Sequence, residues 1–401
     1  VKKDSKFIYF GVVTLVLIGL SCQQKTKVST TPQTSKIKDA TGTTWKIQMR
    51  RLEQDLTELY YLALDSQKFN FPENEKKIEE RLVDLKNVSD EVSHSPMTQI
   101  QDPSLRFISY DFKEQMDLTW SSFKEGKKEF SRYNVLHISS YCIECHTRTS
   151  QGPSFGSEKI SQQLGELSLL DQGEYLTAVR RFDEALLAYE QYFRNGNLDF
   201  QNLFKAEKAA QAALAITVRY LKSPVKTEKF VLAIASTPDL PLYLQRSIGV
   251  WKKDLRSWKA EKTTKMNLKT IRQRLDLANV RRFEGGGLAG EILVMRSLSD
   301  LHDLLVKLTQ KDEKAEALYL LGLAYSQTES RLFVNLEEKY FETCIRSFPQ
   351  LNWANKCFEK LEESVIMDYS GSAGVFIPAE VQTKLESLRA LLKGPKKRNQ
   401  L

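Results

Sequence analysis

Between residues 45 and 146, apolar residues recur every three or four positions in four separate stretches. The stripes are Trp45, Met49, Leu52, Leu56, Leu59 and Ala63; Ile78, Leu82, Leu85, Val88 and Val92; Leu105, Ile108, Phe112, Met116, Trp120 and Phe123; and Val135, Ile138, Cys142, Cys145 and His146. Such spacing places these side chains on one face of a helix. Asp102-Pro103 predicts a helix start, because Asp caps a helix and Pro suits its first turn. We therefore expect four antiparallel helices packed as a bundle.

A second helical region is expected after the Gly-, Pro- and Ser-rich break at residues 151–157. Two patterns of small and aromatic residues occur in it: Gly173, Tyr175, Ala178, Phe182 and Ala185, and then residues 317–325 with Phe341, Cys344 and Pro349. Both patterns resemble the tetratricopeptide repeat, in which small residues let paired helices approach and aromatic side chains fill the gap. The resemblance implies a TPR-like α-solenoid over residues 158–392. A generic helical bundle also explains the pattern.

The glycine-rich residues 285–290 formally contain the spacing GxGxxG of nucleotide-binding loops. A helical pattern precedes them where a strand is required, so we interpret them as a turn into the next helix. His302 in that helix is expected to be a surface or packing residue. We find no Ser/His/Asp or paired-carboxylate constellation and do not expect an enzyme.

The chain of 401 residues has an ordinary globular composition and a formal net charge of +8. Its length suggests two to three domains, and the fold class is expected to be all-α. Read along the whole chain, Lys and Arg are scattered, with small excesses at both ends. We therefore expect neither one basic patch nor nucleic-acid binding, and residues 393–401 are interpreted as a solvated basic tail.

The N-terminus carries an export pattern. Lys2, Lys3 and Lys6 precede 14 uncharged residues, fewer than the ~20 needed to span a bilayer. The stretch ends at Ser21-Cys22, which resembles the lipobox of bacterial lipoproteins although Gly19 stands where an aliphatic residue is usual. This resemblance implies a signal peptide at residues 1–21 and lipidation of Cys22, which would anchor the protein facing the periplasm. Gln23 after the Cys, rather than Asp, favours the outer membrane by analogy with Gram-negative lipoproteins. An ordinary cleaved signal is the alternative. Residues 22–44 are polar and are expected to form a flexible tether.

Residues 142–146, Cys-Ile-Glu-Cys-His, form a CxxCH motif. Covalent haem attachment requires two thiols one helical turn apart, and His146 lies four residues after Cys142 on the same face, where it can ligate iron. A zinc site would need a fourth ligand, and a thioredoxin-like pair would need a βαβ unit, which the sequence does not show. The motif therefore predicts one haem c, bound by Cys142 and Cys145 with His146 as axial ligand.

Four helices with a CxxCH at the end of the last one resemble the cytochrome c′ and cytochrome c-556 family over residues 45–150. The resemblance implies that a Met of the first helix ligates the iron opposite His146, which makes Met49 the candidate. Met49 as an ordinary core residue is the alternative, and His137, His94 and Met97 are weaker candidates. Thr149 and Ser150 stand where the family often has an aromatic and a basic residue, so Arg148 is the candidate partner for a haem propionate.

Cys344 and Cys357 are the remaining cysteines. The repeat pattern places them on two consecutive packed helices, and an oxidising periplasm favours a disulfide between them. Two buried free thiols are the alternative.

Three functions follow as hypotheses. The first is electron transfer by a lipid-anchored monohaem cytochrome whose helical repeats dock redox or envelope proteins. The second is capture of nitric oxide or carbon monoxide by five-coordinate iron, and the third is an envelope scaffold.

Overall fold

A computed structural model describes residues 38–96, 102–148, 164–195, 203–261, 266–328 and 336–393. The predicted signal peptide, Cys22, most of the tether and the tail after Lys393 lie outside these residues. So do Met97, Thr149, Ser150 and the break at residues 151–157. Apart from one hairpin of two short strands, the described residues fold into helices joined by turns, and the protein is all-α. No helix in this part of the chain combines the length and the apolar composition of a bilayer span.

The N-terminal part is a run of helices, the last three of which pack as sequential neighbours. They are α1 (Lys38–Leu64), the short α2 (Ser66–Asn70), α3 (Pro72–Ser93), α4 (Pro103–Lys124) and α5 (Lys128–His146). Asp102 caps α4 as predicted, accepting a hydrogen bond from the Ser104 backbone N–H, with Pro103 in the first turn. The predicted stripe of α3 is buried along its whole length, which explains why α3 packs on α4.

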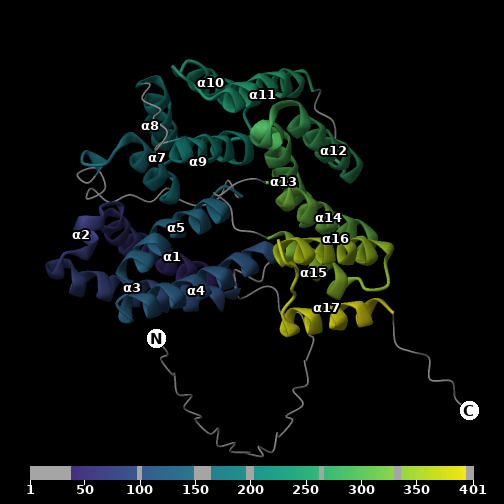
Figure 1. The fold of residues 1–401 in the computed structure, drawn as a ribbon, viewed down its shortest axis with the longest axis horizontal. Coiled ribbons are helices and arrows are strands. Elements are labelled where there is room, and N and C mark those ends of the chain that lie inside the picture. The colour runs from purple at the N-terminus through teal and green to yellow at the C-terminus, as the bar shows by residue number, and fades with distance from the viewer. Residues whose placement is uncertain are drawn as a thin grey trace, which may run out of the picture. The chain divides into compact units, whose positions relative to one another are not determined.

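The remaining helices also pack in sequential pairs (Figure 1). They are α7 (Leu169–Ala178), α8 (Phe182–Asn195), α9 (Leu203–Leu214), α10 (Pro224–Ala235), α11 (Leu242–Ala260), α12 (Leu268–Gly285), α13 (Glu291–Leu305), α14 (Lys311–Ser326), α15 (Glu337–Ser347), α16 (Asn352–Asp368) and α17 (Ala379–Leu392). A π-helical segment η2 (Ala215–Tyr220) continues α9, and a 3₁₀ turn η3 (Gly287–Gly290) precedes α13. Strands β1 (Ser370–Gly371) and β2 (Gly374–Val375) form the antiparallel hairpin between α16 and α17.

Two of the helix pairs share the same close approach of a glycine to an aromatic ring. Gly173 of α7 lies against Tyr189 of α8, and Gly322 of α14 lies against Phe341 of α15. A Cβ atom at either glycine would overlap the ring, so only glycine permits the approach. The two residues are 16 positions apart in the first pair and 19 in the second.

The glycine-rich residues 285–290 form a turn, as predicted. Gly286 has a φ of +90°, a conformation that favours glycine, and η3 follows directly. A Cβ atom on Gly290 would overlap the Ala278 carbonyl oxygen of α12. The glycines therefore serve the packing of α12 against the start of α13.

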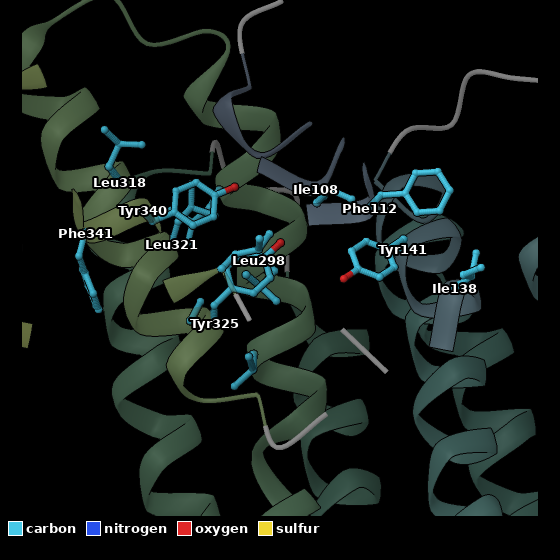
Figure 2. Packing of buried hydrophobic residues seen from close by; sticks show 14 of the residues in the cluster. Ile108, Phe112, Ile138, Tyr141, Leu298, Leu318, Leu321, Tyr325, Tyr340 and Phe341 are labelled. Atoms are coloured by element: carbon cyan, nitrogen blue, oxygen red, sulfur yellow. The ribbon is translucent and has the colours of Figure 1, made fainter. Parts of the chain in front are cut away.

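The hydrophobic core runs without interruption from the N-terminal helices into the C-terminal ones. One cluster includes Ile108 and Tyr141 of α4 and α5 together with Leu298, Tyr325 and Tyr340 of α13, α14 and α15 (Figure 2). Residues 40–401 form one compact unit. The proposed boundary near residue 150 stays a prediction, and the helices on its two sides share this core.

Candidate functional site

The CxxCH motif forms the last turn of α5. Cys142 and Cys145 are half-buried against the main hydrophobic cluster, and both are free thiols. Burial raises the pKa of each thiol to about 12, because the thiolate would lose its hydration. Both cysteines are therefore protonated at neutral pH, and the low-pKa thiolate of a redox dithiol is absent from this pair.

His146 is held in one defined tautomer. Its Nδ1 lies 3.2 Å from the carbonyl oxygen of Ala178 in α7, and because a carbonyl can only accept, Nδ1 carries the hydrogen. Burial, with the positive charge of Arg180 next in importance, lowers the pKa of His146 to about 3. The imidazole is therefore neutral, with its lone pair on Nε2. A backbone carbonyl on the other ring nitrogen is the usual support of a metal-ligating histidine.

The chemistry of this donor set fits a covalently attached haem. Two neutral thiols stand one turn apart on one helix, and a neutral imidazole follows directly after the second. In the described ranges, no three His, Cys, Asp or Glu side chains converge as the ligands of one metal ion would. Cys142, Cys145 and His146 are therefore not arranged as three ligands of a single ion.

Met49 is half-buried on α1. Arg132 near the start of α5 donates a 2.8 Å hydrogen bond to the Ala63 carbonyl near the end of α1, and the Tyr60 hydroxyl lies beside Ser139. The two helices are therefore antiparallel. Met49 precedes Ala63 by 14 residues, and His146 follows Arg132 by 14, so both lie about 21 Å along their helices from this contact. Met49 and His146 thus share one end of the α1–α5 pair.

The weaker candidates in the described residues have other contacts. His137 stacks on Tyr133 and meets Tyr141 edge-on, and His94 is exposed at the end of α3 with its Nδ1 facing the Asp90 carbonyl. Met97 lies outside the described residues.

Glu144, between the two motif cysteines, is the centre of a buried ion network that the sequence did not indicate. Its side chain is fully buried. Arg219 of η2 contacts both carboxylate oxygens, at 2.9 and 3.1 Å. Arg148 donates from Nε at 2.9 Å, and the Tyr325 hydroxyl of α14 donates at 2.6 Å. Burial alone would raise the pKa of Glu144, but the charges of Arg219 and Arg148 outweigh it and hold the pKa well below its usual range.

The network continues to Asp102 and His302. Asp102 Oδ2 lies 3.6 Å from Arg148 Nη1 and 2.8 Å from His302 Nδ1, and His302 Nε2 lies 3.1 Å from the Tyr325 hydroxyl. The four charges of Glu144, Asp102, Arg148 and Arg219 cancel, so a protonated His302 would add an excess cation. Burial chiefly, then the charge of Arg148, lowers the pKa of His302 against the opposing effect of Asp102. We therefore take His302 as neutral and buried, one of the two roles expected for it.

Arg148 is not in the position expected of a solvent-side partner for a haem propionate. Its side chain is almost fully buried and contacts Glu144 and Tyr325. A propionate would have to displace one of these protein partners. The pairing of Arg148 with a haem propionate stays a prediction, and Glu144 and Tyr325 compete with the propionate for this side chain.

Cys344 of α15 and Cys357 of α16 are joined as a disulfide, with Cα atoms 6.5 Å apart and a separation of 13 positions in sequence. Both side chains are fully buried in the main cluster. The two cysteines thus lie on consecutive packed helices, as the repeat pattern places them.

Comparison of the chain with protein-family models, with curated proteins and with solved structures gave no match. The interpretation of the site therefore depends on its own residues and geometry.

Proposed function

We propose that the protein is an exported, lipid-anchored c-type cytochrome with one haem, which transfers electrons and docks protein partners through its C-terminal helices. The single observation that carries the proposal is the CxxCH turn at the end of α5, in which His146 is a neutral imidazole whose Nδ1 donates to the Ala178 carbonyl, so that Nε2 would be the ligating atom.

Each residue of this site would have a distinct task. Cys142 and Cys145 would hold the porphyrin through two thioether bonds, and His146 would ligate the iron. The haem, when bound, supplies a centre that accepts and releases one electron. The half-buried surroundings of the two cysteines exclude part of the solvent, and the Ala178 carbonyl restrains rotation of the His146 ring.

The order of helices α1, α3, α4 and α5 supports the proposed four-helix cytochrome domain, because the motif ends the last of them. The glycine–ring pairs of α7–α8 and α14–α15 support the proposed TPR-like repeats. In both, a glycine of the first helix admits an aromatic ring of the second. Stacked helical pairs commonly present extended surfaces for protein partners.

Haem staining of the full chain on a denaturing gel tests the proposal, after expression with a c-type maturation system. The wild-type chain should stain, and the Cys142→Ser/Cys145→Ser variant should not. The matched control, Cys344→Ser/Cys357→Ser, also loses two cysteines and should still stain. An unstained wild-type band would refute the proposal.

Absorption spectra of the stained protein distinguish electron transfer from gas binding. With Met49 as sixth ligand the iron is low-spin, and Met49→Leu should make it high-spin and abolish the thioether-to-iron charge-transfer band. Met116→Leu, in the core of α4, is the control and should leave the spectrum unchanged. High-spin iron in the wild type would favour capture of nitric oxide or carbon monoxide.

The proposed anchor is tested separately. Cys22→Ala should move the protein from the membrane fraction to the soluble periplasmic fraction, because lipidation of Cys22 is the proposed attachment. Unchanged membrane association of this variant would contradict the lipobox interpretation without affecting the haem proposal.

A further inference from the structure

The net positive charge is concentrated in one segment of the chain. Residues 224–285, which include α10, α11 and α12, contain 14 Lys and Arg but only six Asp and Glu. The segment therefore has a net charge of +8, equal to that of the whole chain, and the other 339 residues sum to zero. This concentration of charge corrects the expectation that Lys and Arg are scattered, which took account only of the small excesses at the two ends of the chain.

Part of this charge forms a stripe on the outer side of α11. Arg246, Lys253 and Arg256 are exposed and follow one another at seven and three residues, which places them on one helix face. None of the described carboxylates forms an ion pair with Arg246 or Arg256, and Lys253 has only a long contact of 3.7 Å to Glu284. These cations are thus available to an external anion.

The neighbouring helix α12 exposes apolar side chains beside this stripe. Leu277, Val280 and Phe283 recur every three residues and are 39%, 50% and 92% exposed. Helices α11 and α12 pack together, and the contact between Lys253 and Glu284 joins their exposed edges. We call these six residues, Arg246, Lys253, Arg256, Leu277, Val280 and Phe283, the basic–apolar face.

We propose that the basic–apolar face rests on an anionic phospholipid surface, with the Phe283 ring inserted at the level of the headgroups. A bilayer interface offers phosphate anions and hydrocarbon side by side, which is the combination that this face complements. An aromatic ring exposed over nine-tenths of its surface, on a helix packed against one that carries exposed cations, has the composition of an interfacial anchor. The proposal goes beyond the haem function and does not require lipidation of Cys22.

Vesicle co-sedimentation of the full, haem-loaded chain tests it, with Cys22→Ala as background so that no acyl chain contributes. The protein should bind vesicles of 70% phosphatidylcholine and 30% phosphatidylglycerol in about 50 mM salt, and should dissociate at about 500 mM salt. It should not bind vesicles of pure phosphatidylcholine. Equal binding to both vesicles, or no binding to either, would overturn the proposal.

Variants locate the contact. Arg246→Glu/Arg256→Glu should weaken binding at least ~30-fold, because each cation lost near an anionic surface weakens it by about fivefold. Phe283→Ser should weaken it about tenfold. The matched controls are Lys76→Glu/Lys205→Glu, which changes two exposed lysines outside the face, and Leu187→Ser, which removes an exposed apolar side chain of α8.

These controls should bind as the parent chain does, and circular dichroism should show that every variant is folded. If controls and face variants lose binding equally, the attraction is only that of overall charge and the proposal fails. If vesicles are not bound but polyglutamate is, with dependence on Arg246 and Arg256, the face is a site for an acidic protein instead.

Discussion

Replacing Glu144 by Gln would test the buried ion network most directly, since the side chain keeps its shape and loses only its charge. In the variant, Arg148 and Arg219 would remain buried without their shared carboxylate. Removing one partner of a buried ion pair costs about 3–5 kcal/mol, mostly because the other charge is left uncompensated. Gln can still accept hydrogen bonds from one arginine, so we expect a loss of about 3 kcal/mol in the free energy of unfolding.

The assay is urea denaturation of the full chain, followed by circular dichroism, at constant haem content. The control is Glu79→Gln, which removes an exposed carboxylate paired with Lys124 and should cost less than about 1 kcal/mol. A double variant, Glu144→Gln/Arg219→Gln, should be less destabilised than the sum of its single changes, because the two groups contact each other. If Glu144→Gln costs no more than Glu79→Gln, or the changes are additive, the network does not stabilise the fold as argued.

Three further outcomes are expected in the same assay. Gly322→Ala should destabilise the fold by roughly 1–3 kcal/mol, the cost of overpacking a core. Its control, Gly249→Ala, lies on the exposed side of α11 with open space at its Cβ and should stabilise by about 0.5–1 kcal/mol. Equal effects of the two changes would contradict the close approach of Gly322 to Phe341. Cys344→Ser/Cys357→Ser should cost about 3 kcal/mol, and mass spectrometry of non-reduced peptides that found both thiols alkylated in wild-type protein would refute the pairing. His302→Asn should differ from the wild type in its response to acid. Burial lowers the pKa of His302 in the folded state, so below about pH 6.5 this side chain takes up a proton only when the protein unfolds. The free energy of unfolding of the wild type, relative to that of the variant, should therefore fall between pH 7 and pH 5. A relative gain in the wild type would mean that His302 is charged and paired with Asp102.

The sequence predicted local structure well where one helix face is apolar throughout. The stripe from Ile78 to Val92 is buried along α3, and the cap at Asp102 begins α4 as expected. The first stripe was predicted less well, because Trp45 and Met49 are only half-buried whereas Leu56 and Leu59 are in the core. Helical periodicity gives the face of a helix but not how far along its length a neighbour covers it.

The buried network could not be predicted, for a physical reason. Glu144, Arg219 and Tyr325 are far apart in sequence, and a charged residue within a helical pattern is normally assigned to the solvent-facing side. Arg219 lies in the π-helical segment η2, where the 3.6-residue period by which faces are assigned no longer holds. The glycines were more informative, because a glycine inside a helix is unfavourable unless close packing requires it, and both Gly173 and Gly322 proved to face rings.

The distance in sequence between Glu144 and its partners also sets the order in which these groups become available during synthesis of the chain. Arg219 follows Glu144 by 75 residues, and the Tyr325 hydroxyl that donates to it comes 181 residues later. At a synthesis rate of about 5–20 residues per second, the chain needs about ten to forty seconds to extend from residue 144 to residue 325. During that interval α4 is already present and Arg219 appears after 75 residues, but the Tyr325 hydroxyl that completes the contacts of Glu144 does not yet exist. The buried network beside the CxxCH turn is therefore completed only after α14 has been made.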